Sequence, residues 1–121
     1  MNYEKINQLV AEKVMGWEPV YDDGDIISFI TEYGTLFFSD DDECEWNPST
    51  DIQDAWQVVE KLKIAVIPQA GDPPTDMKYL AEIDRQPFGD NYEAYAGTAE
   101  LAICLVALKA VGVEIDMEVL E

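Results

Sequence analysis

The chain of 121 residues contains no histidine, and this absence excludes much common enzyme chemistry. Histidine is the most frequent general base, a usual zinc ligand and the partner that activates serine or cysteine nucleophiles. The three serines, Ser28, Ser39 and Ser49, do not lie in a nucleophile-elbow sequence. The seven glycines are scattered at turns and form no phosphate-binding loop. The sequence therefore favours a protein that is not an enzyme, with no catalytic residue and no cofactor.

Basic residues are also scarce. Seven lysines and arginines face 26 acids, which gives a net charge of −19. No basic residue lies between Lys13 and Lys61, an interval that holds thirteen acids. Such a chain repels nucleic acids and anionic membranes, so we expect neither as a direct partner. A partner is instead expected to be a basic protein surface. A carboxylate-only hydrolase stays open and requires a concave pocket with convergent acids.

Cysteines and long apolar segments are few. Cys104 lies in an apolar segment and Cys44 among acids, which does not suggest a disulfide framework. The longest apolar stretch, residues 99–112, is too short to span a bilayer. The N-terminus lacks the apolar core of a signal peptide. We therefore expect a cytoplasmic protein that forms one domain over residues 1–121.

Apolar periodicity predicts three helices. The first spans residues 3–15 and ends before Gly16. The second begins at Thr50, which forms a capping box with Gln53, and runs to about Lys63. The third begins at Thr98, ends before Gly112 and is apolar almost all round. The third helix is therefore covered on most sides, or it exposes a face through which residues 98–112 form a homo-oligomer.

Segments rich in β-branched and aromatic residues predict strands at 26–31, 35–39, 64–67, 77–84 and 91–96. Short connections at 32–34 and 85–90 favour hairpins, and residues 22–25 form an acidic turn. The element order is α-β-β-α-β-β-β-α. This order is typical of a single-domain α+β protein, an α/β sandwich with a largely antiparallel sheet of about five strands and three helices.

The stretch from residue 40 to residue 46 is the candidate binding site. It carries five acids and a tryptophan, namely Asp40, Asp41, Asp42, Glu43, Glu45 and Trp46. A calcium loop needs glycine at its sixth position, which this stretch lacks, so no metal site is predicted. A solvated loop, a weak cation site and a surface that imitates nucleic acid remain alternatives. Trp46 either anchors an interface or packs under the following helix, whereas Trp17 and Trp56 are expected in the core.

Three stretches, residues 9–17, 46–62 and 98–114, together resemble small phage and prophage proteins of the phage ABA-sandwich domain family. The segment "NPSTDI" followed by "AW" and "VVEKL" carries most of the resemblance. The resemblance implies an α/β sandwich that is encoded by bacteriophages and expressed in the host cytoplasm. It implies no activity, cofactor or catalytic residue, and it does not extend to the acidic run.

The sequence thus predicts a small acidic accessory protein of phage or prophage origin that binds a basic host or phage protein. One alternative is a self-assembling, scaffold-like protein that uses the apolar C-terminal helix. Another is a nucleic-acid-mimicking inhibitor of a host defence or DNA-handling protein. A carboxylate-based or metal-dependent enzyme is the remaining class.

Overall fold

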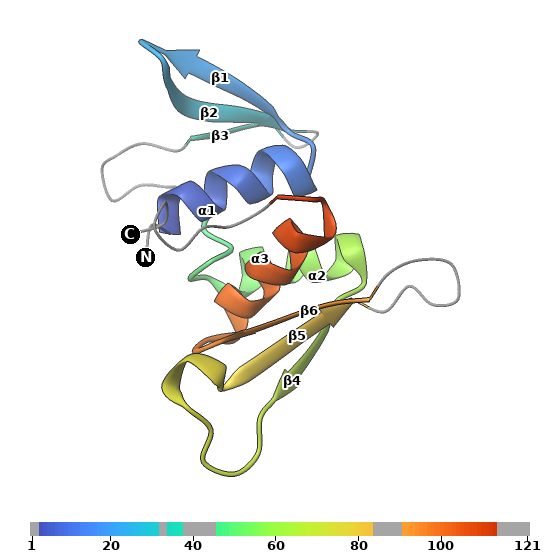
Figure 1. Ribbon diagram of the computed structural model, residues 1–121. Helices are drawn as coiled ribbons and strands as arrows, with labels where there is room; N and C mark the ends of the chain where they lie inside the picture. The colour runs from blue at the N-terminus through green and yellow to red at the C-terminus, as the bar shows by residue number, and fades with distance from the viewer. Residues whose placement is uncertain (1–2, 32–33, 38–45, 84–90, 114–121) are drawn as a thin grey trace.

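We describe a computed structural model of the chain, which places residues 3–31, 34–37, 46–83 and 91–113. Asn2, Cys44 and the predicted connection at 85–90 lie outside these residues. The elements follow in the order α1 (Tyr3–Leu9), a π-helical turn η1 (Val10–Val14), β1 (Glu18–Asp22), β2 (Asp25–Thr31), β3 (Gly34–Phe37), α2 (Ile52–Leu62), β4 (Ala65–Pro68), a 3-10 turn η2 (Thr75–Met77), β5 (Tyr79–Ile83), β6 (Tyr92–Ala96) and α3 (Ala99–Ala110) (Figure 1).

The strands form two antiparallel sheets with the helices between them. One sheet has the order β1-β2-β3 and the other the order β4-β5-β6. Figure 1 shows α1, α2 and α3 in the layer that separates the two sheets. The predicted α+β sandwich with antiparallel pairing is confirmed. The predicted single sheet of about five strands is corrected to two sheets with three strands each.

Strand β1 was missing from the predicted order. Its sequence, Glu-Pro-Val-Tyr-Asp, has acids at both ends and a proline, so it does not read as a strand from composition alone. An edge strand tolerates proline, and β1 pairs only with β2 in its sheet. Asp23 and Gly24 join the two strands with positive φ angles of 50° and 86°. An Asp-Gly pair is a strong hairpin signal, which makes the predicted acidic turn a hairpin turn.

The first helix occupies the predicted span but changes its winding. The α-helical hydrogen bonds of α1 give way to wider ones in η1, where Met15 N donates to Val10 O over 3.0 Å. Val10 and Val14 are buried, as the apolar periodicity predicts. Gly16 then has a φ of 74°, the left-handed conformation that ends a helix readily.

Helix α2 begins one residue later than predicted. Asp51, not Thr50, is the N-cap, and its carboxylate accepts a hydrogen bond from Gln53 N over 2.9 Å. The inward face carries Ala55 and Val58, both fully buried. Trp56, expected in the core, is 51% exposed, because it lies at the flank of this inward face and not at its centre.

Helix α3 is the centre of the molecule. It begins at the predicted cap, where Thr98 Oγ1 accepts from Leu101 N over 3.2 Å, and lies across β5 and β6. Seven of its residues are buried: Leu101, Ala102, Ile103, Cys104, Val106, Ala107 and Leu108. Burial raises the pKa of the Cys104 thiol and keeps it protonated. The helix is therefore covered by its own chain, which leaves it little apolar surface for a homo-oligomer.

The free edge of β6 receives a side chain from the same helix. Lys109 Nζ donates to the backbone carbonyl of Glu93 over 3.0 Å. Lysine at a sheet edge hinders pairing with a further strand. At the other edge of the sheet, β4 is only four residues long and ends in Pro68, which has no N–H to donate.

Candidate functional site

The acidic run that the sequence predicts as a binding surface lies outside the described residues. This holds for Asp40, Asp41, Asp42, Glu43 and Glu45, and their role stays a prediction. Trp46, the last residue of the predicted site, is described, and its surroundings can be compared with the two interpretations.

Trp46 lies in the core. Its side chain is 2% exposed, and its ring meets Trp17 edge to face with a centroid distance of 4.6 Å. The indole Nε1 donates to Gln57 Oε1 of α2 over 3.0 Å, so the polar end of the ring is also satisfied. Trp46 therefore packs under the following helix. The interface role is corrected, since a side chain buried to this degree offers no surface to a partner.

The segment after Trp46 is held by a buried polar group from α1. Asn7 is 2% exposed, and its Oδ1 accepts from Ser49 N over 3.1 Å and from Ser49 Oγ over 2.8 Å. Asn7 Nδ2 also donates to Asn47 Oδ1 over 3.4 Å. Buried polar atoms require such partners, so these bonds hold the segment that precedes α2 against α1.

Asp54 completes this arrangement from the first turn of α2. Its Oδ2 accepts a hydrogen bond from Asn47 N over 2.9 Å. Burial raises the pKa of Asp54, the bond from Asn47 lowers it, and the charge of Asp51 raises it, with a net upward shift. Asn47, Ser49 and Asp51 are thus engaged in starting a helix, which agrees with the structural role that the sequence indicates.

The best-defined open surface is the face of the sheet β4-β5-β6 that points away from α3, which we call the outer sheet face. Two cross-strand rows form its centre, as the register of the strands shows. The apolar row comprises Ile67, Leu80 and Tyr95, and the acidic row comprises Ala65, Glu82 and Glu93. Ile67 is 41% and Tyr95 is 38% exposed. The face therefore presents apolar and anionic groups side by side.

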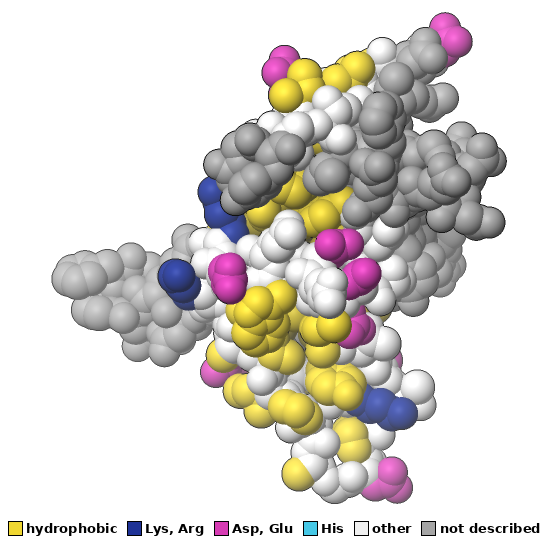
Figure 2. All heavy atoms as spheres, turned by 180° about the vertical axis from the view of Figure 1, so that it is seen from behind, with side chains coloured by type: hydrophobic (Ala, Val, Ile, Leu, Met, Phe, Trp, Pro, Cys, Tyr) yellow, Lys and Arg dark blue, Asp and Glu magenta, His cyan; other side chains and the backbone are white. Residues whose placement is uncertain are grey.

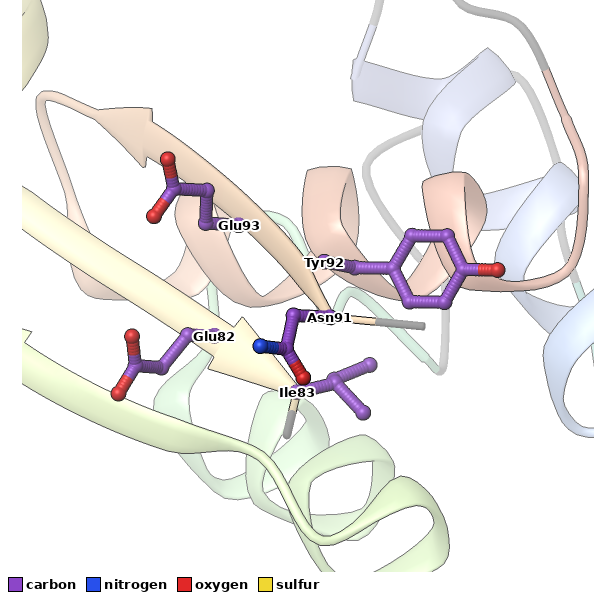
Figure 3. A pocket seen from close by; sticks show the side chains of 5 residues that line it. All are labelled: Glu82, Ile83, Asn91, Tyr92 and Glu93. Atoms are coloured by element: carbon purple, nitrogen blue, oxygen red, sulfur yellow. The ribbon is translucent and has the colours of Figure 1, made fainter. Parts of the chain in front are cut away.

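A cavity of about 330 Å³ opens at the end of β5 and β6. Its lining residues are Glu82, Ile83, Asn91, Tyr92 and Glu93. In Figure 3 the two glutamates project from the side of the sheet opposite α3, while Tyr92 and Ile83 project toward the helices. The carboxyl groups point away from one another, so they do not converge on one reacting atom in the way that a pair of catalytic acids does.

Glu82 and Glu93 are directly opposite each other in the ladder. Like charges in this position destabilise a sheet. Within residues 3–31, 34–37, 46–83 and 91–113, neither carboxylate forms an ion pair. Each of the two carboxylates is suited to an ammonium or guanidinium group from outside the chain, since both are cations that bind carboxylates.

The described part of the chain holds no group of three or more acids, cysteines or histidines arranged to bind a metal ion. Two carboxylates and an amide supply fewer oxygen ligands than a calcium site normally uses. Within the same residues, no helix is long and apolar enough to cross a membrane.

A second exposed apolar feature lies on α2. Ile52 and Trp56 are one turn apart on the same side of the helix and are 45% and 51% exposed. Figure 2 shows the molecule from behind. Hydrophobic side chains collect in the lower half of that view, the half that contains α2 and the sheet β4-β5-β6.

The acidic row is not among the sites predicted from the sequence, although the sequence contains half of its signal. Successive side chains of a strand point to opposite faces of the sheet. In "YLAEI" the Glu82 side chain therefore points to the face opposite Ala81, and in "YEAYA" the Glu93 side chain points to the face opposite Ala94. The missing half is the register, which decides that the two glutamates share one row. Register depends on the connection at 84–90 and on packing against α3, and a single strand sequence contains neither.

The fold and the surface together define a small α+β sandwich with two three-stranded sheets around central helices and one open, anionic sheet face. A sequence model of the phage ABA sandwich domain matches residues 8–108. The chain therefore belongs to the phage ABA sandwich domain family, as the resemblance of its helices indicated.

A solved structure extends this result to nearly the whole chain. The crystal structure of a phage protein from Bacillus cereus ATCC 14579 is similar with a TM-score of 0.68 and 32% sequence identity. The match covers 96% of this chain and 93% of that protein. Among the curated proteins compared, none matches the chain.

Proposed function

We propose that this phage-family protein is an accessory protein that acts by binding a basic protein surface. The observation that supports the proposal is the acidic row, in which Glu82 and Glu93 are opposite each other on an open sheet face. Two like charges in one cross-strand pair lower the stability of the sheet. A cationic side chain of a partner removes this repulsion when it binds, which gives the pair a role in association.

The overall charge favours the same class of partner. A net charge of −19 attracts cationic surfaces over a Debye length and accelerates their encounter. The predicted binding residues Asp40 to Glu45 add to this field wherever they lie. Nucleic acids and anionic lipids carry the wrong sign of charge for such an interaction.

The test compares two double variants that remove the same charge. Glu82→Gln with Glu93→Gln neutralises the acidic row, and Asp72→Asn with Asp76→Asn neutralises two exposed acids of the loop before β5. The immobilised proteins are exposed to extract of phage-infected bacterial cells at low and at high salt. We expect the wild type to capture a basic protein at low salt and release it at high salt.

The acidic-row variant should weaken this capture about twofold to thirtyfold, because an exposed ion pair contributes about 0.2–1 kcal/mol and two are removed. The loop variant should retain most of it. A third variant, with amides at Asp40, Asp41, Asp42 and Glu43, tests the predicted binding residues in the same way. Equal capture by the wild type and by both the acidic-row and 40–43 variants would exclude the proposal.

A further inference from the structure

We infer that the outer sheet face is the docking surface and that its occupant is a basic protein surface bearing an exposed apolar strip. The inference rests on the proposed function and adds to it the place and the chemistry of contact. It depends on the apolar row as well as on the charges.

The apolar row is continuous across all three strands. Ile67 of β4 is opposite Leu80 of β5, and Leu80 is opposite Tyr95 of β6. Tyrosine is enriched at interface centres because it combines a large apolar area with few rotatable bonds. A row of this kind beside a solvated acidic row resembles the apolar core and polar rim of an interface.

The acidic row indicates which partner covers the apolar row. Glu82 and Glu93 are in the row next to Leu80 and Tyr95, so any surface that touches the tyrosine also approaches the carboxylates. An acidic or neutral surface would bury these carboxylates without compensation, which is costly. An arginine beside an apolar residue satisfies both rows, since its guanidinium binds carboxylates and stacks on aromatic rings.

A second copy of this chain fits the surface poorly. Two copies would bring together chains with a net charge of −19 each, and face-to-face packing would add the acidic row of one copy to that of the other. A partner strand added at an edge is also disfavoured, because Lys109 occupies a carbonyl at the β6 edge and Pro68 ends β4. The open face is therefore the better route for a partner of opposite charge.

The Ile52 and Trp56 pair on α2 supplies a matched comparison. It exposes apolar area of the same order as Ile67 and Tyr95, yet it lies outside the rows that contain the acidic pair. If exposed apolar area alone determined docking, the two places would contribute equally. If docking needs the apolar row beside the cross-strand pair of glutamates, the outer sheet face should matter and the α2 pair, which has Glu60 one turn from Trp56 but no such acidic pair, should not.

The experiment uses two synthetic peptides of equal length and equal arginine content. In the first peptide, leucines and a tryptophan form an apolar stripe beside the arginines. In the second peptide, serine and glutamine replace the leucines and the tryptophan. Fluorescence anisotropy of the labelled peptides gives the affinity for the full chain at low salt. We expect the striped peptide to bind about tenfold more tightly, an advantage equivalent to about 1.4 kcal/mol.

Substitution of the apolar row decides where this advantage arises. Ile67→Thr with Tyr95→Thr places a residue that favours strands at both positions and should abolish the advantage of the striped peptide. Tyr95→Thr alone should reduce it, and this variant serves if the double variant is unstable. Ile52→Gln with Trp56→Gln should leave the advantage unchanged. Equal affinities of the two peptides, or an advantage lost only in the α2 variant, would overturn the inference.

Glu82→Gln with Glu93→Gln separates this inference from the proposed function. If that variant weakens both peptides while the threonine variant weakens neither, charge recognition stands and the apolar contact fails. If it weakens neither peptide, the acidic row has no part in recognition and this inference fails, while the variant at residues 40–43 then decides the proposed function. Sedimentation of the chain alone tests the remaining occupant, a second copy of the chain. A dimer that dissociates in the variant with threonine at positions 67 and 95 would assign the face to that second copy.

Discussion

The two sheets have the same number of strands and the same antiparallel pairing, but they are held to the helices in different ways. The sheet β1-β2-β3 inserts the large side chain of Phe29 into the core, where it is fully buried. The sheet β4-β5-β6 presents small residues beneath α3, among them Ala81, fully buried, and Ala96, 3% exposed. Among the residues whose burial is described, the first sheet thus contributes a bulky aromatic contact, whereas the second lets α3 approach closely over its alanines.

The opposite faces of the two sheets differ as well. In β2, Ser28 points away from the side that Phe29 occupies, yet it is 3% exposed. In β5 and β6, the corresponding outer positions include Leu80, half-buried, and Tyr95, partly open. The sheet β1-β2-β3 is therefore covered on both sides at its centre, whereas the sheet β4-β5-β6 keeps one side for solvent or a partner.

Phe29→Ala should have the largest effect on stability. Removal of a fully buried phenylalanine leaves a cavity and costs about 3–5 kcal/mol. Urea denaturation followed by circular dichroism measures the loss, and hydrogen exchange shows whether β1, β2 and β3 lose protection first. Ile30→Thr, at the exposed neighbouring position, is the control and should change stability by about 0.5 kcal/mol or less. Similar losses in both variants would contradict the role of Phe29 as a large core contact of this sheet.

Ala81→Leu tests the other mode of attachment. A larger side chain beneath α3 overpacks the interface and should cost about 1–3 kcal/mol in the free energy of unfolding. Ala65→Leu makes the same change at an exposed position of β4 and should be close to neutral. If both leucines are tolerated equally, α3 does not approach the sheet as closely as the burial of Ala81 indicates.

The smallest expected effect on stability concerns the hydrogen bonds between Asn7 and Ser49. Asn7 belongs to α1, and Ser49 precedes α2, so their hydrogen bonds join elements far apart in the chain. A double-mutant cycle of Asn7→Ala and Ser49→Ala should give a coupling of about 0.5–1.5 kcal/mol, the net contribution of a typical hydrogen bond. Additive losses would show that the link does not contribute to stability.

The sequence was sufficient for most elements and for the class of fold. All three helices and five of the six strands occupy the predicted regions, because long apolar periodicity and β-branched runs are local signals. The division into two sheets was missed, since strand patterns do not specify which strands pair. Strand β1 was missed because its paired state depends on β2, although Asp23-Gly24 indicated the hairpin.

The candidate site was predicted less well than the fold. The acidic run at 40–45 is a compositional signal, and it predicts charge but not position. Trp46 takes the buried one of its two predicted places, whereas Trp56, expected in the core, is half exposed. Trp56 lies on α2, and a shift of a few tens of degrees around a helix axis separates the core from solvent. Such a rotation is set by packing against α3, which the local sequence does not contain.

The contact between Lys109 and Glu93 O has a consequence for the behaviour of the protein in a crowded cell. Open three-stranded sheets are seeds for polymerisation, because each free edge is a template for another strand. Here a helix that must be present for folding also delivers the amine that closes one edge. Protection of this edge is therefore expected to form in the same step as the core and to depend on the docking of α3.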